Sequence, residues 1–185
     1  MKITCYHGTH QRNELSISKT GFRSSAENEY LGAGIYFFEE AEFSNALEEA
    51  ICFCRNVRYL EKKDIIVFRA SVESEKVLDL VSNVEHRKLF DLAKQKIRLV
   101  LKFSQSVDSK VEDYRIFNLI DREKSFEVIR ALIEAAKEQQ DHRSYVVRRP
   151  QIQICVKEPS TIKSINIAWR NKIGRYQEWT TGKKP

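Results

Sequence analysis

Residues 32–38 read Gly-Ala-Gly-Ile-Tyr-Phe-Phe, two glycines followed by a short apolar and aromatic run. The glycines free the backbone to turn, and the run after them favours an extended strand. We expect Phe37 and Phe38 to pack in the core, whereas Tyr36 could present its ring to a flat heteroaromatic ligand. The plainer interpretation of the same residues is a loop that leads into a core strand.

Hydrophobic periodicity and turn-forming residues predict further elements on both sides of this strand. Before it come a strand at residues 3–7, one or two helical turns at residues 13–19 that end at Gly21, and a polar loop at residues 23–30. After it, apolar residues recur at three- and four-residue spacing and predict a helix over about residues 39–57.

The elements expected in the second half of the chain complete an order of strands and helices that predicts an α+β domain. Its expected elements are strands at residues 65–72 and 77–80, a helix from a capping box at Ser82 and Glu85 to about Leu101, a helical block over about residues 112–139, and strands at residues 144–147, 152–156 and 164–169. The polar tail either frays or docks through Trp179. We therefore expect a single domain over residues 1–185, with a helical insertion at about residues 82–140 and a basic tail at residues 170–185.

The composition is that of an ordinary globular domain. Of 185 residues, 42% are hydrophobic and 31% charged, and no apolar run approaches the roughly 18 residues of a membrane span. Residues 1–6 lack the apolar core of a signal peptide. We expect a cytoplasmic protein without membrane contact, unless a delivery system exports it without a cleaved signal. The four cysteines have no zinc-like spacing, so we expect buried thiols and no metal site. The net charge of +6 suits either a nucleic-acid partner or merely a basic, solvated surface.

Two other short motifs have chemical potential. In Tyr6-His7-Gly8-Thr9, a His at a strand end can point into a cleft while the Gly backbone lets a ligand approach closely. Alone, His-Gly is also typical of a plain turn. In the run from Gln151 to Val156, Gln151 and Gln153 share one face of a predicted strand because side chains alternate. A half-exposed strand with outward polar residues explains that pattern without any site.

Taken together, these motifs resemble the ADP-ribosyltransferase fold in its His-Tyr-Glu class, the diphtheria-toxin-like and poly(ADP-ribose) polymerase branch. That family has His-Gly-Thr on its first strand, then a Gly-x-Gly-Ile-Tyr-Phe strand and a helix, and a catalytic Glu that opens a late strand. The resemblance is strong over residues 3–50 and weaker over 144–167, and residues 73–140 carry no motif. It implies a split β-sheet core with flanking helices and NAD as the substrate.

The resemblance also implies a role for each matching residue. His7 would hydrogen-bond the nicotinamide-side ribose of NAD, and Gly8 would offer its backbone N–H and C=O to the nicotinamide amide. Thr9 would lie near the adenosine end of the cleft. Tyr36, which follows Gly34 at the strand entrance, would flank the nicotinamide ring.

The sequence departs from the family at the catalytic Glu. Gln153 is the best match for that residue, which in the family contacts the ribose 2′-OH and stabilises an oxocarbenium-like transition state. Gln can hydrogen-bond the hydroxyl but brings no charge, and loss of one preorganised electrostatic group costs roughly 10²–10³ in rate. This argues against chain elongation and leaves single-unit transfer or an inactive domain. Gln151 matches the position that helps mono-ADP-ribosyltransferases choose an acceptor, and Glu158 is a poor geometric substitute.

A second departure concerns the other face of nicotinamide. Many relatives place a second Tyr on the following helix, where this chain has Leu47, and Phe43 could fill that role from one turn earlier. Arg148 and Arg149 could meet a phosphate of NAD or of a nucleic acid, or form a solvated strand edge.

Three functions remain open from the residues. The first is a mono-ADP-ribosyltransferase that cleaves NAD at the nicotinamide–ribose bond and passes ADP-ribose to a protein or nucleic-acid acceptor. A small solitary transferase of this kind resembles a bacterial or phage toxin or a defence effector, for which a neutralising antitoxin would be a partner. The second, motivated by Gln153, is a catalytically degenerate NAD-binding or protein-interaction domain. The third is a basic RNA-binding domain whose glycine motif is coincidental.

Overall fold

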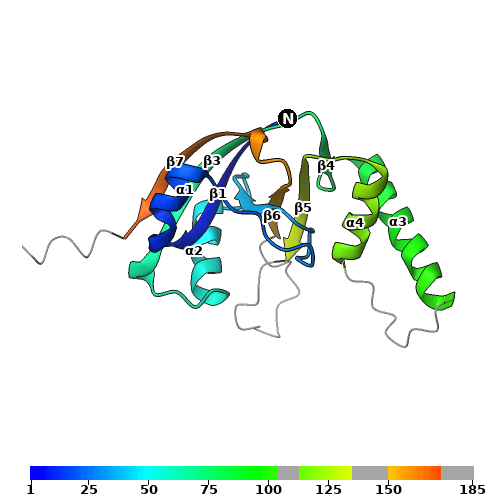
Figure 1. Cartoon of the computed structure of the whole chain (residues 1–185), viewed down its shortest axis with the longest axis horizontal. Helices are drawn as coiled ribbons and strands as arrows, with labels where there is room; N and C mark the ends of the chain where they lie inside the picture. The colour runs from blue at the N-terminus through cyan, green and yellow to red at the C-terminus, as the bar shows by residue number, and fades with distance from the viewer. Residues whose placement is uncertain (104–112, 135–149, 172–185) are drawn as a thin grey trace, which may run out of the picture.

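The computed structural model describes residues 1–103, 113–134 and 150–171, and it shows an α+β protein built on one seven-stranded mixed sheet (Figure 1). The elements, with η for 3₁₀ turns, are β1 (Lys2–His10), η1 (Gln11–Asn13), α1 (Glu14–Thr20), β2 (Ile35–Glu39), α2 (Ala46–Asn56), η2 (Lys62–Asp64), β3 (Ile65–Glu73), β4 (Val77–Asp79), α3 (Val84–Phe103), α4 (Asp113–Glu123), β5 (Val128–Glu134), β6 (Pro150–Val156), η3 (Pro159–Thr161) and β7 (Ile162–Arg170). The strand order is β4-β5-β6-β2-β1-β3-β7; among these described strands, β4 and β5 pair in parallel and the other neighbours pair antiparallel. The predicted α+β class is confirmed.

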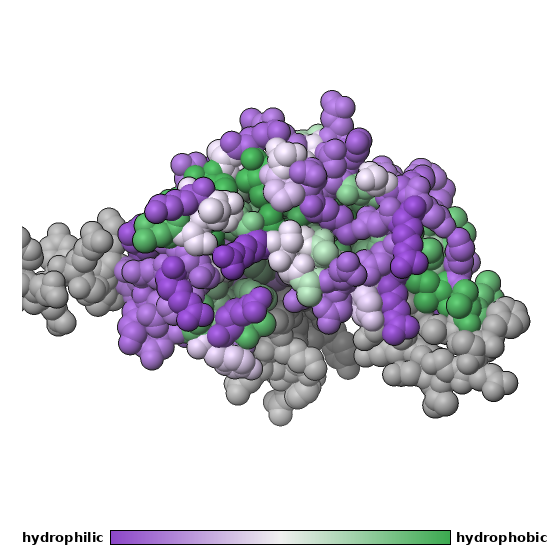
Figure 2. Space-filling view, viewed as in Figure 1, coloured by the Kyte–Doolittle hydropathy of each residue, from purple (hydrophilic) through white to green (hydrophobic). Residues whose placement is uncertain are grey.

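The helices cover the sheet in separate places. α1 packs through Ile17 against Ile66 and Phe68 of β3. α2 packs against the opposite face of β3, where Ile65 and Val67 are fully buried, because side chains of a strand alternate between its faces. α3 and α4 lie at the other end of the sheet, beside β4 and β5 (Figure 1). Hydrophilic side chains cover most of the face seen in Figure 2.

Most of the predicted strands are present, as is the first helix. The strand expected at residues 3–7 is part of the longer β1, and the helical turns at residues 13–19 correspond to α1. Gly21 ends α1 with a φ of 77° and donates its N–H to the Ile17 carbonyl. This left-handed backbone is one that glycine adopts at no steric cost, which explains why the helix stops there.

The second helix begins later than its apolar periodicity predicts. α2 starts at Ala46 rather than near residue 39, because Ala41 and Ser44 pair in a tight turn. Asn45 then caps the helix by accepting a hydrogen bond from the Glu48 N–H at 3.2 Å. Asn is among the strongest N-caps, and this local polar signal defines the helix start better than the spacing of Ala41 does.

The helical block predicted over residues 112–139 is wrong in its second half. α4 ends at Glu123, and residues 128–134 form β5, which pairs with both β4 and β6. A short apolar run of this kind cannot be assigned as helix or strand from periodicity alone, and strand pairing on both sides decides the outcome. The segment at residues 82–140 is therefore not a purely helical insertion, since it contributes a strand to the sheet.

A charged cluster fixes β5 in place. Arg130 contacts Glu39 of β2 at 2.6 and 2.9 Å, and it contacts Asp79 of β4 at 3.1 Å. The three side chains are largely buried, so removal of Arg130 would leave two largely buried carboxylates without their cation. This cluster joins β2 to the β4–β5 end of the sheet.

The predicted capping box of the third helix is wrong in its residues. Asn83 Oδ1 accepts hydrogen bonds from the backbone N–H groups of Glu85 and His86, at 2.9 and 3.2 Å, and so caps α3. The Ser82 hydroxyl instead donates to Asp79. Asn caps a helix as well as Ser does, so position alone could not choose between them.

Several predictions fall outside the described residues: the strand at residues 144–147, Arg148, Arg149, Trp179 and the tail beyond residue 171. Within the described ranges, Cys5, Cys54 and Cys155 are buried thiols, as predicted, whereas Cys52 is only half-buried. Among those same residues, no helix is both long and apolar enough to cross a membrane.

Candidate functional site

β1 is held differently along its two edges. Toward β3 it is paired along its whole length, from Lys2 to His10. Toward β2 the paired positions are Cys5 and Tyr6. Beyond Tyr6 the two strands separate, and a pocket of about 490 Å³ opens beside residues 7–9, a volume within the range of small-molecule sites.

His7 bridges the separated strands with its side chain. Its Nδ1 lies 2.8 Å from the Tyr36 carbonyl oxygen, so Nδ1 must carry the proton and donate. The ring also packs edge-on against Phe22 and Phe37, with centroids 4.9 and 5.6 Å away. Burial lowers the pKa of His7 below its ordinary value; the hydrogen bond to Tyr36 opposes this shift and the Arg58 charge adds to it. A neutral His7 with Nδ1 engaged keeps Nε2 as an acceptor for a hydroxyl group.

Gly8 offers its backbone to the pocket and its missing side chain to α2. The Thr4 carbonyl accepts from the Glu40 N–H at 3.0 Å. Because backbone groups along an antiparallel strand alternate between its two neighbours, those of Gly8 face the β2 side, where the gap lies. A Cβ at residue 8 would lie 2.4 Å from the Ala50 carbonyl oxygen and 2.7 Å from Cys54 Sγ. Glycine is thus required by packing, whatever binds in front of it.

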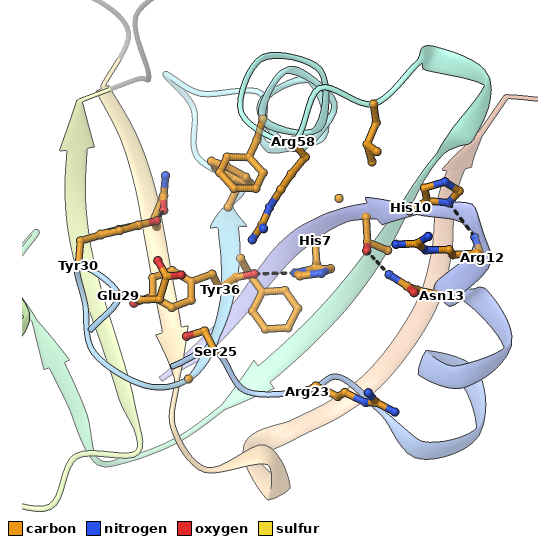
Figure 3. Close-up of a pocket in the computed structure, with 18 residues that line it drawn as sticks. His7, His10, Arg12, Asn13, Arg23, Ser25, Glu29, Tyr30, Tyr36 and Arg58 are labelled. Carbon is orange, nitrogen blue, oxygen red and sulfur yellow. Dashed lines mark hydrogen bonds between the residues drawn. The ribbon is translucent and has the colours of Figure 1, made fainter. Parts of the chain in front are cut away.

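The structure brings six predicted site residues to this pocket: His7, Gly8, Thr9, Gly34, Tyr36 and Gln153. They come from β1, the start of β2 and the middle of β6. The Thr9 hydroxyl accepts from Asn13 Nδ2 at 2.9 Å. Figure 3 shows the pocket extending from Tyr30 and Tyr36, past His7, to His10 and Arg12.

Tyr36 presents a ring and not a hydroxyl. Its hydroxyl donates to the Gly32 carbonyl at 2.7 Å and accepts from the Leu31 N–H at 3.0 Å. Burial raises the pKa of Tyr36, so the phenol stays neutral. The Tyr30 ring lies against it, with centroids 5.0 Å apart and planes tilted by 57°. The two rings together form an aromatic wall at one end of the pocket.

Gln153 belongs to a row of buried polar groups. Both Gln151 and Gln153 are 7% exposed, whereas the sequence alone also allowed outward, half-exposed side chains. The Tyr30 hydroxyl donates to Gln153 Oε1, Gln153 Nε2 donates to Gln151 Oε1 at 3.4 Å, and Gln151 Nε2 donates to the Glu49 carboxylate. Gln151 itself is not among the residues that line the pocket.

Sequence reasoning missed five pocket residues that bear on chemistry: Arg12, Arg23, Glu29, Tyr30 and Arg58. Arg23 and Arg58 follow the ends of α1 and α2, in loops without periodicity. Glu29 and Tyr30 lie in a segment that was predicted only as a polar loop. The one sequence signal that could have found any of them was Tyr30, an aromatic residue just before the glycine motif. Among the described lining residues Glu29 bears the one carboxylate, so the arginines make the pocket basic.

Two other residues considered from the sequence lie elsewhere. Phe43 is 53% exposed in the turn before α2 and does not line the pocket, so its expected place beside nicotinamide is not met. Glu158 caps η3 by accepting from the Ser160 N–H at 3.1 Å, which commits its carboxylate away from β6. Among the described residues, no three His, Cys, Asp or Glu side chains cluster as metal ligands would.

Comparison with known proteins places the chain beside an archaeal relative. No family model and no solved structure matches the chain. The chain is 30% identical over 189 residues to the uncharacterized protein MJ0359 of Methanocaldococcus jannaschii, and the match covers 89% of this chain and 86% of that protein. The chain therefore belongs to the same family as this archaeal protein.

Proposed function

We propose that the pocket binds NAD and that the protein transfers a single ADP-ribose to a macromolecular acceptor, protein or nucleic acid. The observation that carries the proposal is the order of groups along one pocket. Two tyrosine rings and a carboxylate lie at one end, an imidazole in the middle, and arginine and histidine side chains at the other (Figure 3). NAD has a matching order: a flat cationic nicotinamide, a ribose and an anionic pyrophosphate.

Each part of NAD finds chemistry that suits it. The Tyr36 and Tyr30 rings favour a flat cation through their negative faces. The backbone N–H and C=O of Gly8 match the carboxamide of nicotinamide, which both donates and accepts. Arginine side chains bind phosphate oxygens in charge-assisted hydrogen bonds, and Arg12 and Arg58 both line the pocket.

The same groups support departure of nicotinamide. As the bond between ribose C1′ and the nicotinamide nitrogen breaks, its electron pair leaves with the ring, and positive charge develops on the ribose. His7 Nε2 would accept a hydrogen bond from a ribose hydroxyl, and Gln153 would hold a second one. The carboxylate of Glu29 would favour the developing cation. An acceptor nucleophile then bonds to C1′ and releases its proton.

The test is to measure nicotinamide release and transfer of labelled ADP-ribose with purified protein, NAD and a cell lysate. We expect His7→Ala and Tyr36→Ala each to lower both rates by roughly 10²–10³. Tyr114→Ala, on α4 outside the pocket, serves as the control and should change neither rate. Full transfer by both pocket variants would overturn the proposal.

Binding of NAD without turnover is the second candidate function. It is favoured by the neutral amide of Gln153, whose Oε1 already accepts a hydrogen bond from Tyr30. A ligand that binds only the folded state raises the melting temperature. A melting-temperature rise with NAD that His7→Ala removes, together with no nicotinamide release by the unaltered protein, would select this function over transfer.

A further inference from the structure

The row of polar side chains behind the pocket has a defined direction. It runs from the Tyr30 hydroxyl through Gln153 and Gln151 to the carboxylate of Glu49 on α2. Both glutamines are nine-tenths buried. Four side chains from a loop, a strand and a helix thus form one connected series of hydrogen bonds.

A carboxylate at the end of such a row sets the orientation of every amide in it. A carboxylate can only accept hydrogen bonds, so Gln151 must turn its NH₂ group toward Glu49. The Gln151 oxygen then faces Gln153, which must turn its own NH₂ group inward and its oxygen toward Tyr30. Glu49 lies in the first turn of α2, where the helix dipole favours a negative charge.

We propose that Glu49 is a positioning residue that orients the Gln153 amide through Gln151. This inference rests on the proposed function, because it assigns the remaining hydrogen-bonding capacity of Gln153 to the ribose of NAD. Glu49 polarises the row, and hydrogen bonds in a connected series strengthen one another. The Glu49 carboxylate thus acts on the pocket through two intervening glutamines, Gln151 and Gln153. In the family pattern, a carboxylate would occupy the Gln153 position directly.

The proposal also reassigns Gln151. Its amide is buried and donates to Glu49 while accepting from Gln153, so its polar atoms serve the row. The acceptor-selecting role implied by the family resemblance needs a side chain that faces the incoming acceptor. The geometry points instead to a connecting role between α2 and the pocket.

The orientation is tested first without any nucleotide, by NMR of the glutamine side-chain NH₂ groups. The Gln151 and Gln153 signals are assigned by their loss in Gln151→Leu and Gln153→Leu. In the unaltered protein, both signals should be shifted from those of free amides and should exchange slowly with water. Glu49→Gln should move both toward the free-amide position, because a glutamine can donate as well as accept. Glu48→Gln, the exposed neighbour on the same helix, should leave both signals in place. Unchanged signals in Glu49→Gln would overturn the proposal.

The consequence for NAD is tested by kinetics. Glu49→Gln should lower kcat for nicotinamide release by about 10- to 100-fold, the cost of a misplaced group, with KM for NAD changed less than about twofold. In a Gln153→Ala background the same substitution should change the remaining rate less than about twofold, because its effect travels through Gln153. A full additional loss in that background, or a fall in melting temperature that accounts for the lost rate, would show a merely structural role.

The two experiments separate failure of this inference from failure of the proposed function. Intact amide signals that respond to Glu49→Gln, in a protein that never releases nicotinamide, would support the row and overturn the catalytic assignment. Nicotinamide release by a protein whose amide signals ignore Glu49 would support the proposed function and overturn this inference.

Discussion

The two edges of β1 differ in how far they are paired: the edge toward β3 is paired throughout, and the edge toward β2 is paired only in part. Along β3 the strand is paired from Lys2 to His10, and residues 65–68 of β3 are buried on both faces of the sheet. Along β2 the pairing covers Cys5 and Tyr6, after which the His7 side chain takes the Tyr36 carbonyl that a continued ladder would have used. A site forms where a well-anchored strand is left half-paired.

The difference shows how a rigid site is made from an interrupted sheet. The closed edge and the packing of α2 hold the backbone of residues 7–9 in place, while the open edge directs backbone and side-chain groups into the pocket. Groups held on a strand are positioned more accurately than groups on a loop. The following predictions separate the contributions of the two edges.

The largest effect is expected on the closed edge. Phe68 pairs with His7 in register and is 1% exposed. Phe68→Ala should lower the free energy of unfolding by about 3–5 kcal/mol, since it leaves a cavity between α1 and the sheet. Urea unfolding at neutral pH measures this, with Tyr59→Ala, 86% exposed, as the control. A loss below about 1 kcal/mol would mean that β3 is not the anchor of β1.

The next effect concerns Gly8, whose backbone groups face the open edge and whose missing side chain faces α2. Gly8→Ala should lower the free energy of unfolding by about 1–3 kcal/mol, because its Cβ would meet Ala50 and Cys54 at 2.4 and 2.7 Å. Adding Cys54→Ala should restore part of the loss by removing Sγ, while the Ala50 carbonyl still resists. A Gly8→Ala variant of full stability would show that α2 can move away and that Gly8 serves only the ligand.

The fold and the pocket were predictable to different extents. His7, Tyr36 and Gln153 are far apart in the chain, yet the resemblance of their motifs to the ADP-ribosyltransferase family implied that they would meet, and the structure brings them to one pocket. Local signals sufficed for β1, α1 and β3, whose apolar spacing and end residues agree with their tertiary neighbours. What role each residue has toward NAD stays a prediction.

The rest depends on contacts that no local pattern encodes. β5 is a strand because β4 and β6 flank it, and its apolar run would suit a buried helix equally well. Tyr30 lies in an irregular loop whose path is set by Gly32, with a φ of 82°, and by the hydrogen bonds of the Tyr36 hydroxyl to Leu31 and Gly32. Its place against Tyr36 therefore follows from the folded pocket alone.

A smaller effect is expected from the protonation of His7 on the open edge. Burial lowers the pKa of His7 in the folded protein below the ordinary value of about 6.5. Below that pH the unfolded chain binds a proton that the folded protein resists, so stability is full above about pH 6.5 and falls as the pH drops toward the folded pKa. His7→Gln keeps a donor for the Tyr36 carbonyl and should show a smaller loss between pH 7.5 and 5.5 in urea unfolding. An identical pH dependence in both proteins would mean that His7 is freely hydrated.

The smallest expected effect distinguishes the two candidate aromatic partners of Tyr36. The Tyr30 ring lies 5.0 Å from that of Tyr36, whereas Phe43 is 53% exposed outside the pocket. An aromatic pair contributes roughly 0.5–1.5 kcal/mol beyond its buried area, so Tyr30→Ala should weaken NAD binding by about 2- to 10-fold. Phe43→Ala should leave the affinity unchanged, and calorimetric titration with NAD measures both. If Phe43→Ala weakens binding and Tyr30→Ala does not, the second aromatic comes from the turn before α2, and the loop at Tyr30 must move aside when NAD binds.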